Sequence, residues 1–148
     1  MGTRSTTHVY EINDGKTDKA ALKKLKPVLS LYRQMDGYPS GHGADLADFI
    51  HNMTIVNGFG ADAKAGTHAN GAGCFAAQLV KYLKEGIGYI YITNAKDRQE
   101  YDYHLYLRAE ELFKIGKSEI FVTVKSGRKT LFDGTRDEYV KWVGEYEG

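Results

Sequence analysis

The sequence contains a single cysteine and has almost no net charge. Cys74 has no second thiol with which to form an internal disulfide, but a chain of 148 residues can bury a core large enough to fold without one. The 20 lysines and arginines balance 19 aspartates and glutamates, which leaves a net charge of +1. Such a chain has no overall field to attract a long nucleic acid or an anionic membrane, so any anion site must be local.

Long apolar runs and metal-ligand spacings are also missing. No run approaches the roughly 18 apolar residues that cross a bilayer, which excludes membrane insertion. The start MGTRSTTHVYE lacks the apolar core of a signal peptide, and together with the lone cysteine this favours the cytoplasm. The five histidines are scattered without the spacing of zinc ligands, so we predict no metal and no other cofactor.

The apolar pattern predicts one domain over residues 1–148. Residues 6–12 and 28–34 both alternate between apolar and polar side chains, which indicates an antiparallel pair of strands. The cationic segment 14–27 between them is predicted to be an insertion or excursion from the sheet.

The remainder of the chain adds helices and further strands. Helices are predicted after Ser40 as the N-cap, over 74–85, and after a capping box of Thr135 and Glu138, and strands over 89–93, 101–108, 118–125 and 129–132. The first two of these strands are predicted to form a hairpin, and 57–73 to be a long loop. We therefore expect an α+β domain in which two or three helices pack on one face of an antiparallel β-sheet.

One group of polar residues surrounds the glycine-rich turn GYPSGHG at 37–43. An arginine can hold a phosphate or carboxylate through two parallel hydrogen bonds, and a turn that enters a helix offers free backbone N–H groups. The alternative is ordinary turn chemistry with a local ion pair between Arg33 and Asp36. The predicted ligand-binding residues are Arg33, Gln34, Asp36, Tyr38, Ser40, His42 and Asn70.

Asn70 belongs to this set because Asn70-Gly71-Ala72-Gly73 precedes the second predicted helix. The segment lacks the glycine patterns of the known phosphate-binding loops. The two helix starts would converge on one ligand if the helices pack side by side. Tyrosines on strands can stack nucleobases, although they serve packing more often, and the candidates are Tyr89, Tyr91, Tyr101, Tyr103 and Tyr106.

Cys74 offers an alternative, catalytic interpretation. A thiol at a helix N-terminus is acidified by the helix dipole, and His104, His42 or His68 would serve as its base in a cysteine-dependent hydrolase. Against this, a lone cysteine beside Phe75 and Ala76 is more often a small packing residue. Alternation in 101–108 also places His104 on the polar face of its strand, with Asp102, Tyr106 and Arg108.

Several blocks of the sequence resemble small uncharacterised proteins encoded by bacteriophages and prophages. The resemblance rests on the opening MGTRS, on YRQ and DGYPSGHG at 32–43, and on NGAGC with AAQL at 70–79. It extends over most of the chain and departs in 13–26, where the insertion is longer than the family pattern. The resemblance implies the cytoplasm of an infected bacterium and carries no established activity.

These observations predict a phage accessory protein that acts against host defence. It would be a non-enzymatic homo-oligomer that sequesters a small phosphorylated or nucleotide-like ligand, such as an immune signalling nucleotide, in the host bacterial cytoplasm. The alternatives are the hydrolase that uses Cys74 with His104 or His42, and an interaction module that blocks a host protein through exposed tyrosines.

Overall fold

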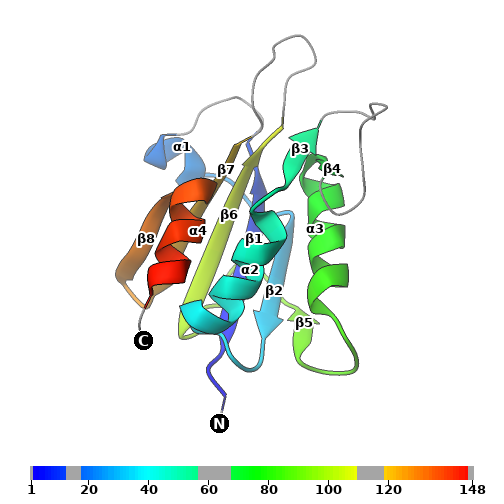
Figure 1. Ribbon diagram of the computed structural model, residues 1–148, viewed down its shortest axis with the longest axis vertical. Helices are drawn as coiled ribbons and strands as arrows, with labels where there is room; N and C mark the ends of the chain where they lie inside the picture. Colours follow the sequence, from blue (N-terminus) through cyan, green and yellow to red (C-terminus); the bar gives the residue numbers. More distant parts are fainter. Residues whose placement is uncertain (1, 13–17, 57–67, 110–118, 147–148) are drawn as a thin grey trace.

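The computed structural model describes residues 2–12, 18–56, 68–109 and 119–146 (Figure 1). Its centre is a six-stranded sheet with the strand order β5-β2-β1-β6-β7-β8. The strands are β1 (Ser5–Glu11), β2 (Leu29–Arg33), β5 (Ile90–Ile92), β6 (Tyr101–Arg108), β7 (Glu119–Ser126) and β8 (Lys129–Thr135). A separate two-stranded sheet pairs β3 (Thr54–Val56) with β4 (His68–Asn70).

The large sheet is mixed and not wholly antiparallel as predicted, because β1 pairs antiparallel with β2 but parallel with β6. The antiparallel pair of the first two long strands confirms the sequence prediction. The predicted hairpin of 89–93 with 101–108 is wrong, since β5 pairs with β2 and β6 pairs with β1. The intervening segment 93–100 is long enough to cross two strands, and the strand pattern alone does not identify the partner.

Three helices cover one face of this sheet: α2 (Ala44–Ile50), α3 (Gly71–Leu83) and α4 (Arg136–Glu145) (Figure 1). We call this the helix face. It receives alternate strand residues such as Val9, Leu105 and Val122, all fully buried in one core with Phe75 and Tyr139 of the helices. The predicted α+β domain with helices on one face is therefore confirmed, and none of the helices in the described ranges is long and apolar enough to cross a membrane.

The opposite side of the sheet, the second face, carries the other strand residues. Its central row contains Thr6, His8 and Tyr10 of β1, which lie beside Asp102, His104 and Tyr106 of β6 in the parallel register. The predicted excursion contributes α1 (Lys19–Lys23), whose side chains line a cavity together with this row. Residues 13–17 of that excursion lie outside the described residues.

The helices α2 and α3 run in opposite directions (Figure 1). The end of α2 leads into β3, which lies parallel to β4, and β4 leads directly into α3. The start of α3 therefore lies near the end of α2. The α3 helix begins at Gly71, three residues before the predicted start, and the positive φ of 75° at this residue suits glycine. Of the predicted loop 57–73, residues 57–67 lie outside the described part.

The first residue of α4 binds the end of α2. Arg136 Nη1 donates to the carbonyl oxygens of Ile50 and Met53, at 3.4 and 2.5 Å, beside the predicted capping box of Thr135 and Glu138, which the structure confirms. Ile50 is the last residue of α2, and its carbonyl also accepts from Met53 N at 3.0 Å, whereas Met53 lies three residues beyond the helix end.

Replacing Arg136 with alanine is therefore expected to lower the free energy of unfolding by about 1–3 kcal/mol. The measurement is urea denaturation at pH 7, with Arg128→Ala as the control, because Arg128 is exposed in the turn between β7 and β8. Equal losses in the two variants would contradict this role for Arg136.

Candidate functional site

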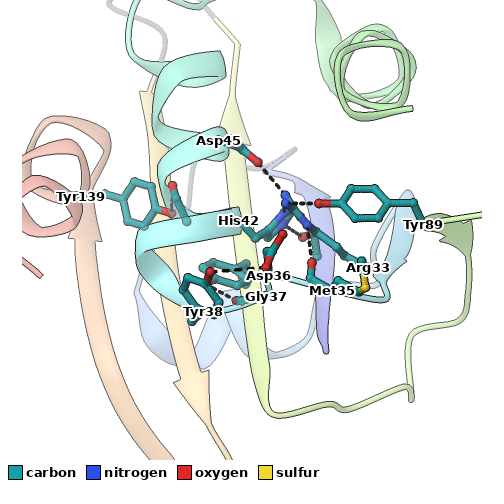
Figure 2. Close-up of polar contacts among 12 residues, drawn as sticks. Arg33, Met35, Asp36, Gly37, Tyr38, His42, Asp45, Tyr89 and Tyr139 are labelled. Atoms are coloured by element: carbon teal, nitrogen blue, oxygen red, sulfur yellow. Dashed lines mark hydrogen bonds and ion pairs between the residues drawn. The ribbon is translucent and has the colours of Figure 1, made fainter. Parts of the chain in front are cut away.

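Arg33 ends β2 with its side chain on the helix face, where it is 6 % exposed. Four groups of the protein surround its guanidinium group (Figure 2). Nε donates to Met35 O at 2.7 Å, Nη1 donates to Asp45 Oδ2 at 2.7 Å and to His42 Nδ1 at 3.1 Å, and Nη2 donates to the hydroxyl of Tyr89. The predicted anion-binding arginine is thus engaged inside the protein, and its carboxylate partner is Asp45.

A cavity of about 420 Å³ and another of about 580 Å³ lie on opposite sides of the sheet, and the larger one adjoins Arg33. The larger cavity also contains Asp45, Glu85 and Tyr82. Burial first, and then the negative charges of the nearby Asp48 and Asp45 carboxylates, raise the pKa of Tyr82. An anion is unsuited to this cavity, because two carboxylates oppose one arginine that is already paired.

His42 lies beneath the glycine-rich turn and is 1 % exposed. Its Nδ1 accepts from Arg33, so its Nε2 carries the proton and donates to Thr7 Oγ1 at 2.6 Å. Burial and the charge of Arg33 lower the pKa of His42 to about 3. At neutral pH the ring is a buried, uncharged link between β1 and β2, with both nitrogens bonded inside the protein.

The turn itself is held by tyrosines of the core. The hydroxyls of Tyr103 and Tyr139 donate to the carbonyls of Gly37 and Gly43, at 2.7 and 2.8 Å. A Cβ at Gly41 would lie 2.4 Å from the carbonyl oxygen of Asp36, so this position requires glycine. The glycines and the histidine of the turn therefore serve close packing of η1 (Pro39–Gly43), one turn of π-helix, against the sheet.

The remaining predicted binding residues around the turn do not line either of the two cavities described above. Gln34, Asp36 and Ser40 are exposed, and Tyr38 is half-buried with its hydroxyl 3.3 Å from Asp36 Oδ1. The prediction of Ser40 as a helix N-cap is wrong, because η1 begins one residue earlier, after Tyr38, and continues into α2.

Asn70 lies at the other end of the helix layer from η1. The chain enters α2 at η1, whereas α3 starts near the end of α2 (Figure 1). The two helix starts therefore point in opposite directions and do not share a ligand. Hydrophobic spacing predicted both helices but not their relative direction, which depends on the pairing of β3 with β4.

The structure does not bring Cys74 together with His104 or His42. Cys74 is exposed on α3, where its Sγ donates to Gln78 Oε1 at 3.1 Å. His104 projects from the second face of the sheet, and His42 is bonded to Arg33 and Thr7. His68, the third candidate base, lies on β4. The hydrolase prediction thus has no supporting dyad with His104 or His42.

The second face carries a stack of aromatic rings across β1 and β6. The His104 ring lies 5.1 Å from His8 and 5.8 Å from Tyr10, and Tyr10 lies 4.5 Å from Tyr106, with interplanar angles of 12–24°. The Tyr10 hydroxyl is 2.8 Å from His104 Nδ1. Alternation along 101–108 correctly predicted that His104 and Tyr106 lie on one face of the strand. The parallel register of β1 then places His8 and Tyr10 beside these two rings.

The cavity of about 420 Å³ lies over this stack. Its volume is within the range of roughly 300–1,000 Å³ typical of small-molecule sites. The floor is made by Tyr10, His104 and Tyr106, and one wall by α1. The lining residues are Tyr10, Lys19, Leu22, Lys23, Leu25, Arg98, His104, Tyr106, Thr123, Lys125, Thr130 and Asp133.

Positive charge dominates the cavity, because four cationic side chains face one carboxylate. Lys19 pairs with that carboxylate, Asp133, at 3.4 Å, and within the described ranges Lys23, Arg98 and Lys125 have no acidic partner. Burial first, and then the charges of His8, Arg98 and Lys125, lower the pKa of His104 to about 3. The potential that opposes a proton on this ring would favour an anion.

Sequence reasoning found His104 and Tyr106 but missed the cations that surround them. The cavity combines residues from β1, α1, the 93–100 segment, β6, β7 and β8, so no local spacing marks it. Two features of the sequence could have indicated the cavity. They are the cationic segment 14–27 and the histidines and tyrosines on the polar faces of residues 6–12 and 101–108.

Metal binding and similarity to known proteins give no further guide to the site. Among the described side chains, no three His, Cys, Asp or Glu residues are grouped as metal ligands. In comparisons with known proteins, no family model matches the chain, and no significant match is found among curated proteins or among solved structures.

Proposed function

We propose that this protein binds and sequesters a small phosphorylated, nucleotide-like ligand in the cavity over the second face of the sheet. The observation that carries the proposal is the combination of four cationic side chains with an aromatic floor in a cavity of suitable volume. The function is the one expected from the sequence, whereas the site differs from the predicted corner around Arg33.

The lining provides the two kinds of contact that a nucleotide needs. Lys23, Lys125 and Arg98 can form charge-assisted hydrogen bonds to phosphate oxygens, which are about twice as strong as neutral ones. The half-buried ring of Tyr106 offers an apolar face for a base. Because the net charge of the whole chain is only +1, this attraction is local and selects small anions over long nucleic acids.

Capture without turnover agrees with the chemistry of the lining. His104 is the one histidine among the lining residues, and histidine is the residue type whose unperturbed pKa lies near neutrality. In the described ranges this ring has no carboxylate or thiol partner that would make a catalytic pair. In the bacteriophage setting that the sequence resemblance implies, such a protein would lower the free concentration of a nucleotide immune signal in the host cytoplasm.

The ligand can be identified by native mass spectrometry of the protein purified from bacteria with an active nucleotide-signalling defence. We expect one phosphorylated molecule to be released in stoichiometric amount on denaturation. Absence of any bound molecule, together with no binding to a panel of mononucleotides and cyclic dinucleotides, would contradict the proposal.

Reversing one cavity charge is expected to weaken this binding. Lys125→Glu should raise the Kd roughly 10-fold or more, since a hydrogen bond to a charged group contributes about 1.5–3 kcal/mol. The matched control is Lys141→Glu, which changes the net charge equally but lies exposed on α4, on the helix face. Isothermal titration at two salt concentrations measures both variants. Equal weakening in both would place the binding elsewhere.

A further inference from the structure

His104 is fixed in the cavity with one ring nitrogen available. The side chain is 7 % exposed and stacks between His8 and Tyr10. Nδ1 is bonded to the Tyr10 hydroxyl, and His104 lines the cavity. Within the described ranges Nε2 has no hydrogen-bond partner. This nitrogen is therefore available for a hydrogen bond to a molecule bound in the cavity.

The hydrogen bond to Tyr10 determines which nitrogen carries the proton. The Tyr10 hydroxyl has no other partner among the described residues, and burial raises its pKa, so it stays protonated. In the arrangement that we infer, this hydroxyl donates to Nδ1. Nδ1 therefore accepts, and the proton of the neutral ring lies on Nε2. His104 consequently presents an N–H donor to the cavity.

Two cationic side chains from other parts of the chain act on this donor. The charges of Arg98, in the 93–100 segment, and of Lys125, on β7, both act on the His104 ring. Arg98 uses Nη1 for the carbonyls of Ala95 and Asp97 and for His8 Nε2, which leaves its Nη2 and Nε without partners in the described ranges. An N–H donor beside two cationic side chains suits a tetrahedral oxyanion, because the oxygens of such an anion accept from several directions.

We propose that the phosphate group of the ligand binds at this end of the cavity, with one oxygen accepting from His104 Nε2–H and others paired with Lys125 and Arg98. The inference rests on the proposed function and adds the position and orientation of the ligand. In this orientation Tyr106, the ring of the stack next to Tyr10, contacts the base. His104 is then a recognition residue that acts as a neutral donor.

The first test observes the wild-type protein by ¹⁵N NMR of its histidine rings at pH 7. We expect His104 in the Nε2–H form and a shift of its Nε2 resonance on addition of inorganic phosphate. Sodium chloride at the same ionic strength is expected to leave the resonance unchanged. A proton on Nδ1, or no response of His104 to phosphate, would overturn the inference.

The second test compares the affinities of AMP and adenosine for wild type, His104→Gln and His104→Leu. The preference for AMP is expected to fall roughly 10-fold in His104→Leu, which lacks the donor, and to persist in His104→Gln, whose amide N–H replaces Nε2–H. An unchanged preference in His104→Leu would overturn this inference while the proposed function stands. If wild type binds neither AMP, inorganic phosphate nor any nucleotide of the panel, the proposed function itself fails.

Discussion

Replacing Arg33 with alanine is expected to destabilise the fold by about 3–5 kcal/mol, without acting through a ligand contact. The change removes a buried guanidinium group that satisfies Met35 O, His42 Nδ1, Asp45 and the Tyr89 hydroxyl. Several of these groups are buried or partly buried, so they would lose a partner without gaining full access to water. The truncation also leaves a cavity beneath the turn.

Urea denaturation measures this loss, with Arg4→Ala as the matched control because Arg4 is exposed and immediately precedes β1. The control is expected to change the free energy of unfolding by less than about 0.5 kcal/mol, as ordinary surface substitutions do. If Arg33→Ala were as stable as Arg4→Ala, the internal role of Arg33 would be refuted. A loss of ligand binding in Arg33→Ala is informative only where the variant is shown to be folded.

Arg33 also shows why local sequence does not distinguish an arginine that binds a ligand from one that is paired inside the protein. A guanidinium group after a strand binds a phosphate and a set of internal acceptors with the same geometry. Whether Arg33 binds a ligand or internal groups depends on Asp45 and Tyr89, which lie 12 and 56 residues further along the chain. Their positions follow from the packing of α2 and the pairing of β5, which local sequence does not specify.

Features that depend on a short repeat were predicted well. Alternation in 101–108 placed Asp102, His104 and Tyr106 on one face, because side chains of a strand alternate regardless of its neighbours. The capping box at Thr135 was predicted for the same reason, since both partners lie within one helical turn. The cationic cavity could not be predicted, because its charges come from α1, the 93–100 segment and β7, which meet only in the fold.

The stability of the protein is expected to fall steeply between pH 7 and pH 5. Burial lowers the pKa of both His42 and His104 to about 3, whereas a histidine in an unfolded chain titrates near 6.5. Between these values the unfolded state binds more protons than the folded state, so protonation favours unfolding. The stabilisation is therefore fully present above about pH 6.5 and is lost as the pH falls toward 3. Each histidine accounts for roughly 2 kcal/mol of the loss at pH 5.

Two measurements separate this effect from general acid sensitivity. Urea denaturation at pH 7, 6 and 5 should show a shallower pH dependence in His42→Gln and in His104→Gln than in wild type, and an unchanged one in the exposed control His51→Gln. NMR of the native protein does not depend on how well the variants fold, and it should show neither buried ring titrating from pH 7.5 to 5. A native-state titration of His104 near 6 would contradict the prediction. Such a titration would charge the ring in mildly acidic solution, whereas a low pKa keeps His104 neutral, as in the phosphate site inferred above, from pH 7.5 to 5.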